Sequence, residues 1–126
     1  MTTEQVLAGA YLAKGTIGNL GMPGAPVLQF ALVVVPATHK VSGTVHVTQA
    51  VQGGSYRGQV EGTIYATGFG DVTQVVGLKG QISPDSGTEP IELSLDASMA
   101  INKEWRGKGG FAFANVHVEN APVKPL

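Results

Sequence analysis

A five-residue pattern recurs along the chain: an apolar residue, any residue, a glycine, a polar or small residue, and a second apolar residue. It occurs in Ala13-Lys14-Gly15-Thr16-Ile17, Val41-Ser42-Gly43-Thr44-Val45, Val60-Glu61-Gly62-Thr63-Ile64 and Leu78-Lys79-Gly80-Gln81-Ile82. Alternate side chains of an extended strand face the same way, so each glycine shares the face of its two apolar neighbours. We expect these glycines on the buried face, where the missing side chain lets a strand bend or another backbone approach.

The rest of the chain alternates between apolar and polar residues with a period of two, and helical periodicity is absent. This pattern predicts seven or eight strands joined by short turns. The clearest strands are expected at residues 6–18, 26–35, 41–51, 58–68, 72–83, 91–101 and 109–118. Proline cannot donate a hydrogen bond to a strand ladder, so the proline-containing tail at 120–126 is expected to be irregular.

Consecutive strands joined by short turns pair in antiparallel fashion, which predicts a meander within a single domain of residues 1–126. Two architectures satisfy this pattern, an up-and-down β-barrel and a β-sandwich. Inward glycines at strand centres favour the barrel, because they allow a sheet to coil until its two edges meet. We therefore predict an all-β antiparallel barrel, with the sandwich as the alternative.

The segment 26–35 is apolar on both faces of its predicted strand. Charged residues make up only 13% of the chain, against ~25% in a typical soluble domain. A single-layer barrel leaves the outer row of such a strand exposed unless another chain covers it. The pattern therefore predicts a homo-oligomer, most simply a dimer.

Composition also limits the possible partners. The formal net charge is −1, so the dense cationic surface needed for non-specific nucleic-acid binding is missing. The chain has no cysteine, and no apolar stretch approaches the ~18 residues of a membrane helix. Residues 1–5 lack the basic start of a secretory signal. We expect no nucleic-acid partner, no membrane insertion and, by default, a cytoplasmic location.

Groups that carry chemistry are few and scattered. The histidines do not have the spacing of metal ligands, and the carboxylates on outward rows have no predicted cleft beside them. These residues are His39, His46, His117, Glu61, Glu92 and Asp96. No nucleophile elbow, phosphate-binding loop or dinucleotide fingerprint is present. We expect no catalytic residue, metal or cofactor, although closure of a barrel would bring distant positions together.

Trp105 and Arg106 form the most distinctive cluster, in a turn predicted at 102–107. A loop tryptophan beside an arginine can stack on a sugar or a planar ligand, or anchor a partner protein. The same tryptophan can instead cap the end of the barrel as an apolar plug. Trp105 and Arg106 are therefore the candidate ligand-binding residues.

Glycine-rich segments in roughly the first fifty residues carry a family resemblance. They are Ala8-Gly9-Ala10-Tyr11-Leu12, Thr16-Ile17-Gly18-Asn19, Gly21-Met22-Pro23-Gly24-Ala25-Pro26-Val27, Val41-Ser42-Gly43-Thr44 and Val47-Thr48-Gln49-Ala50-Val51. In these segments the chain resembles a group of small uncharacterised bacterial proteins, the domain of unknown function 1842. The resemblance implies a bacterial origin, and since the family has no assigned activity it implies no functional residue.

Two functional hypotheses follow. In the first, the inward glycines serve close packing, the interior is solid, and the domain is a non-catalytic structural or protein-interaction module. In the second, the domain binds a small apolar or sugar-like ligand at a barrel end near Trp105 and Arg106. Dense packing of protein interiors favours the first hypothesis.

Overall fold

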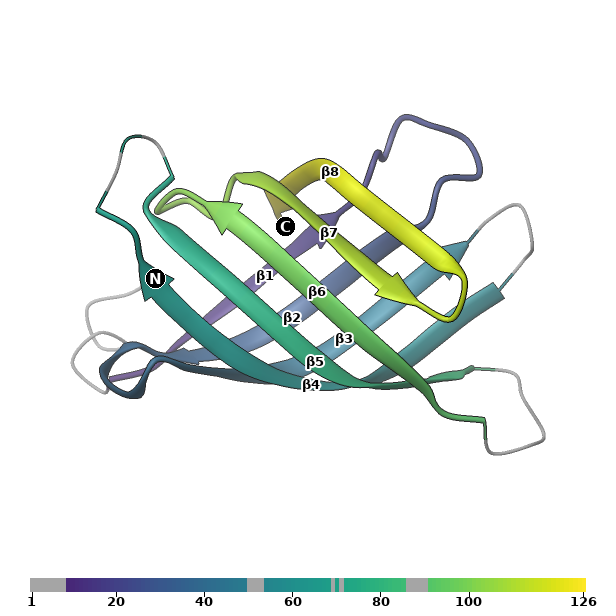
Figure 1. Cartoon of the computed structure of the whole chain (residues 1–126), viewed down its shortest axis with the longest axis horizontal. Helices are drawn as coiled ribbons and strands as arrows, with labels where there is room; N and C mark the ends of the chain where they lie inside the picture. Colours follow the sequence, from purple (N-terminus) through teal and green to yellow (C-terminus); the bar gives the residue numbers. More distant parts are fainter. Residues whose placement is uncertain (1–8, 50–53, 69, 71, 86–90) are drawn as a thin grey trace.

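The computed structural model describes residues 9–49, 54–68, 70, 72–85 and 91–126 of the chain (Figure 1). Eight antiparallel strands form a closed barrel in which each strand pairs with the next and β8 pairs with β1. The strands are β1 (Tyr11–Ile17), β2 (Val27–Val35), β3 (Lys40–Gln49), β4 (Gly54–Ala66), β5 (Gln74–Pro84), β6 (Leu93–Ile101), β7 (Gly107–Phe113) and β8 (Val116–Pro125), with a 3-10 turn, η1 (Pro36–Thr38). The predicted all-β up-and-down barrel is confirmed, and the sandwich alternative is wrong.

Alternate residues of every strand fill the barrel interior, as the period of two predicts. The largest fully buried side chains are Phe30, Ile17, Leu28, Leu32, Leu78, Ile82, Leu95, Met99, Ile101, Val34, Val41 and Val47. The inward row predicted for 91–101 is observed from Leu95 onward. Ile91 is exposed instead, because β6 begins only at Leu93.

The glycines at strand centres allow neighbouring backbones to approach closely. A Cβ atom on Gly62 would overlap the carbonyl oxygen of Gly77 on the adjacent strand β5. On β1, a Cβ on Gly15 would lie 2.6 Å from Cζ of Phe30, whose ring covers the glycine from β2. The missing side chains are therefore replaced by neighbouring atoms, and the space at these two positions is filled.

The C-terminal part of the chain differs from the prediction in two respects. The strand expected at 109–118 is divided by a turn at Ala114, whose φ of 50° is left-handed, so β7 and β8 form a hairpin. The tail expected to be irregular belongs to β8 and closes the barrel against β1. Pro122 still takes part, because its carbonyl accepts a hydrogen bond from the Gly18 amide at 3.0 Å, and accepting requires no proline N–H.

The barrel has two ends of different composition. The left end in Figure 1 contains η1, the β4–β5 connection and the β6–β7 loop with Trp105, and we call it the Trp105 end. The right end contains the β1–β2 loop and the β7–β8 turn. Asp85 follows β5 at this second end, which we call the Asp85 end. Each end holds a group of residues that is relevant to function.

Candidate functional site

A hollow of about 880 Å³ opens at the Trp105 end. Its lining is mainly apolar and comes from the start of β1, from η1, from the β6–β7 loop and from the last residues of the chain. The lining residues used below are Tyr11, Leu12, Gln74, Trp105, Pro125 and Leu126, together with the charged Lys14, Lys103 and Glu104. Ligand sites in proteins typically occupy roughly 300–1,000 Å³ and combine apolar walls with a few polar groups. The hollow has this character.

The β6–β7 loop holds Trp105 in place through Asn102. The side-chain oxygen of Asn102 accepts hydrogen bonds from the amides of Glu104 at 2.9 Å and Arg106 at 3.0 Å. Its backbone amide donates to Arg106 O, and its carbonyl accepts from the Trp105 amide. Trp105 adopts a left-handed φ of 62° within this loop. The short loop thereby turns the indole toward the barrel instead of toward solvent.

The structure separates the two residues that sequence analysis grouped together. Trp105 is only 7% exposed, belongs to the core and lines the hollow. Arg106 is exposed and is not part of the lining. Trp105 therefore closes the barrel interior and also forms part of the wall of an external hollow, while its binding of a ligand stays a prediction.

β1 pairs over a shorter stretch with β8 than with β2. β1 pairs with β2 along its whole length, from Tyr11 to Ile17. Its pairing with β8 covers only Gly15 to Ile17, and β8 ends with the Leu126 amide donating to Lys14 O at 3.0 Å. Consecutive residues of a strand point their N–H and C=O groups to opposite sides, so residues two apart point them to the same side. Leu12 therefore points its backbone groups to the same side as Lys14, the side of β8.

Gln74 contributes an unsatisfied polar atom to the same end. Its Oε1 is buried and has no hydrogen-bond partner among the described residues, and the residue lines the hollow. A buried amide oxygen without a partner costs free energy, typically about 1–3 kcal/mol. Native proteins rarely leave such groups unpaired, so a hydrogen-bond donor that reached Gln74 Oε1 would stabilise this end of the barrel.

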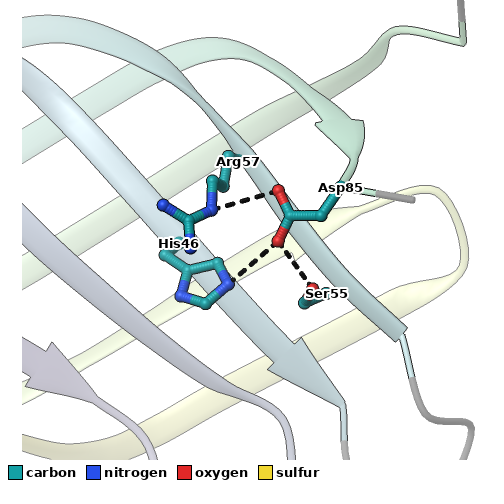
Figure 2. Close-up of polar contacts among 4 residues, drawn as sticks. All are labelled: His46, Ser55, Arg57 and Asp85. Carbon is teal, nitrogen blue, oxygen red and sulfur yellow. Dashed lines mark hydrogen bonds and ion pairs between the residues drawn. The ribbon is translucent and has the colours of Figure 1, made fainter. Parts of the chain in front are cut away.

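The Asp85 end holds a compact polar cluster, shown in Figure 2. Asp85 Oδ2 accepts a hydrogen bond from the Ser55 hydroxyl at 2.6 Å and lies 3.2 Å from His46 Nε2. Asp85 Oδ1 lies 3.1 Å from Arg57 Nε. Together these contacts connect β3 and β4 to the end of β5. The pKa of the Asp85 carboxyl is lowered, first by the Ser55 hydrogen bond and then by Arg57, against an opposing effect of burial.

The cluster contains serine, histidine and aspartate, but the arrangement is not that of a hydrolase triad. In such a triad the histidine accepts the proton of the serine hydroxyl, and the aspartate orients the histidine. Here the Ser55 hydroxyl donates its hydrogen bond to the Asp85 carboxylate and not to a histidine. No general base is therefore in place to activate the hydroxyl for nucleophilic attack. The contacts instead anchor three strands to one another.

The other histidines and carboxylates remain apart. The His39 ring stacks on Tyr65 at the Trp105 end, while His117 lies 3.0 Å from Glu119 on β8. No group of three metal-ligating side chains is found in the described part of the chain. Glu61, Glu92 and Asp96 are exposed, as their outward positions predict. The Asp85 cluster was missed, because it depends on contacts between strands that sequence spacing does not reveal.

A family model supplies the classification. The model of the domain of unknown function 1842 matches residues 8–118. The chain belongs to this family. The match extends well beyond the N-terminal segments that carry the resemblance in the sequence, so the similarity covers most of the barrel and not its first strands alone. No curated protein matches the chain. Within the described residues, no helix is long and apolar enough to cross a membrane.

Proposed function

We propose that this member of the family is a non-catalytic interaction module whose binding site is the hollow at the Trp105 end. The observation that carries the proposal is the combination of apolar walls, Trp105 among them, with an unsatisfied polar atom of the described lining, Gln74 Oε1. Sites that bind ligands combine these two properties, whereas an ordinary surface depression offers polar groups already paired with water or protein. The described lining includes no histidine, serine or aspartate, which is why we favour binding over catalysis.

A small apolar ligand is the second candidate, and Gln74 is the observation that favours it. One buried amide oxygen beside an aromatic wall suits a compact molecule with a single hydrogen-bond donor. Such a ligand would occupy the hollow and not the barrel interior, because the space beside Gly15 and Gly62 is filled by neighbouring atoms.

The proposal is tested by NMR titration of the isotope-labelled protein with two small probes, N-methylacetamide and isopropanol. We expect the largest amide shifts at residues lining the hollow, together with a shift of the Trp105 indole N–H. The chain has a single tryptophan, so this signal is unambiguous. Shifts spread evenly over the surface, or concentrated at the Asp85 end, would contradict the assignment.

A matched pair of variants separates occupation of the hollow from general effects. Ala37→Trp places a large side chain on a lining residue of η1 and should abolish the shifts by filling the hollow. Ala66→Trp adds the same side chain to an exposed residue at the same barrel end, outside the lining, and should leave the shifts unchanged. Equal effects of the two substitutions would count against the hollow.

A further inference from the structure

We propose that copies of this chain associate head to tail, with the apolar outer face of β2 in one copy docked into a recess over β6, β7 and β8 of the next copy. The occupant of the recess is thus a second copy of the chain. This inference goes beyond the proposed function, because it does not depend on the hollow at the Trp105 end. The shapes, the charges and the positions of the two surfaces support it.

The protruding surface is the outward row of β2, which consists of Ala31, Val33 and Val35 and which we call the β2 face. In an antiparallel sheet with one buried side, the outward row normally carries polar side chains that face water. Here Val33 is 45% exposed, while its neighbours Leu32 and Val34 are fully buried. Covering such a row stabilises an assembly by roughly 25 cal/mol per Å² of apolar area removed from water.

The recess is a depression of about 520 Å³ on the outer surface of β6, β7 and β8. Its floor carries little side-chain volume, because Ser98 of β6 pairs with Gly110 of β7. A β-bulge lies beside this pair, since two residues of β8, Glu119 and Asn120, lie opposite Gly110 alone. Asn120 has a left-handed φ of 52° at the bulge. A bulge bends its strand, so the bulge and the small floor residues together shape the recess.

The recess suits the side chains of a large partner better than it suits a small free ligand. Asp96, Lys108 and Glu119 line it and are all exposed. Small-molecule sites bury about 70–90% of the ligand surface, which an open depression on a sheet does not provide. A protein partner needs no such enclosure, because its contacts extend beyond the recess over the neighbouring strands.

The two surfaces carry complementary charges. The residues that pair with the β2 face include Lys14 and Lys40 and no carboxylate. Neither lysine takes part in an ion pair within the described residues. The lining of the recess contains two carboxylates, Asp96 and Glu119, and a single lysine, Lys108. Complementary charge of this kind orients two surfaces and disfavours other pairings.

The positions of the two surfaces decide the symmetry of the assembly. In Figure 1, β2 belongs to the far wall of the barrel and β6–β8 to the near wall, so the surfaces face in different directions. A contact between two different surfaces on opposite walls does not close as a two-fold dimer. Each copy instead binds one neighbour on either side, which produces an open chain or a ring of more than two copies.

A mixture of two variants tests the head-to-tail contact. Val33→Asp disables the β2 face and keeps the recess, whereas Ser98→Trp fills the recess and keeps the β2 face. In sedimentation velocity at micromolar concentration, we expect wild type to form species heavier than a dimer of the 13.0 kDa chain. Each variant alone should be a monomer. An equimolar mixture should form a heterodimer and nothing larger, because only one productive contact is left.

Two further variants serve as controls. Ser94→Trp adds the same side chain to an exposed position of β6 outside the recess lining, so it should assemble like wild type. The double variant Val33→Asp/Ser98→Trp should bind neither single variant. If Ser98→Trp alone assembles like wild type and no mixture rescues Val33→Asp, the β2 face packs against itself and the proposal is wrong. A monomeric wild type would also overturn it.

NMR with isotope labels on one component locates each surface. In the mixture, labelled Val33→Asp should show amide shifts at the recess, and labelled Ser98→Trp should show them at the β2 face. Circular dichroism shows whether both variants fold. If one does not, a dilution series of labelled wild type decides, because the signals of Val33, Ser98 and Gly110 should change together with concentration. Changes at Val33 without changes at the recess would contradict the head-to-tail contact.

A charge reversal tests the electrostatic part of the argument. Lys40→Glu places a carboxylate beside the β2 face and should weaken assembly about ten-fold at low ionic strength, with a smaller effect at high salt. Arg106→Glu makes the same change of net charge at an exposed residue outside both surfaces, and it should leave assembly nearly unchanged. Equal effects of the two reversals would overturn the charge argument.

Discussion

The indole ring of Trp105 packs against the phenyl ring of Phe30, with ring centroids 5.7 Å apart and planes inclined by 41°. This tilted geometry is typical of stabilising aromatic pairs. Phe30 in turn covers Gly15 on β1, so the contact connects the β6–β7 loop to β1 and β2. The core and the hollow therefore share one aromatic layer at the Trp105 end.

We expect Trp105→Ala to lower the free energy of unfolding by about 3–5 kcal/mol, because it removes a buried aromatic side chain and leaves a cavity above Phe30. Urea denaturation followed by far-ultraviolet circular dichroism measures the change. Arg106→Ala is the control in the same loop, and as an exposed side chain it should change stability by less than about 0.5 kcal/mol. Similar effects of the two substitutions would contradict the packing assigned to Trp105.

Gly62 and Gly77 offer a matched pair on adjacent strands. Gly62→Ala would bring Cβ into the carbonyl oxygen of Gly77, so we expect it to destabilise the barrel by about 1–3 kcal/mol or more. At Gly77 the nearest atom to an added Cβ is Thr63 Oγ1 at 4.0 Å, so Gly77→Ala should be neutral or stabilise by up to about 1 kcal/mol. Thermal and urea unfolding of the two variants measure these changes. If Gly62→Ala is as stable as wild type, β4 and β5 are not held at the close separation described for Gly62 and Gly77.

The Asp85 cluster should make the free energy of unfolding depend on pH in the acidic range. The folded-state pKa of Asp85 is lowered, chiefly by the Ser55 hydroxyl, whereas an unfolded aspartate titrates near ~3.9. The contribution is therefore present above that pH and is lost as pH falls through the lowered folded-state pKa. We expect Asp85→Asn to be less stable than wild type at pH 7, with the difference shrinking below about pH 4.

Two variants check this assignment. Ser55→Ala removes the largest cause of the shift, so the pKa of Asp85 should rise, which NMR titration of the carboxyl detects directly. Asp96→Asn removes an exposed carboxylate that forms no ion pair among the described residues, and it should leave the acid dependence of unfolding unchanged. An unchanged acid dependence in Asp85→Asn would show that the cluster does not couple to folding.

We further predict a homo-oligomer that uses the outer face of β2. Leu32 is fully buried, whereas its neighbour Val33 is 45% exposed and pairs with the exposed Leu12 of β1. Leu32→Asp should unfold the barrel, because it buries an unpaired charge, while Val33→Asp should leave the fold intact and dissociate the oligomer. Sedimentation velocity at micromolar concentration measures the assembly; a wild-type particle of 13.0 kDa would contradict the prediction.

Sequence alone predicted the strands and their inward faces well, because both follow from local alternation. The row Leu95, Ala97, Met99 and Ile101 is buried as its period of two indicates. The boundary between β7 and β8 was missed, because it depends on the left-handed backbone conformation of one residue, Ala114. The prolines of the tail led to the wrong prediction of an irregular segment. A proline disrupts a strand only where the pairing needs its N–H as a donor, and this depends on the neighbouring strands.

The sequence by itself determined the all-β class, the antiparallel order and the role of the central glycines. These properties depend on neighbours along the chain and on backbone sterics. Only the tertiary structure decided which groups meet: His46 with Asp85 at one end, Trp105 with Phe30 at the other, and Thr16 of β1 with Lys124 of β8 at the seam. Barrel closure sets these contacts through the register of the β1–β8 seam, and that register is a property of the whole sheet.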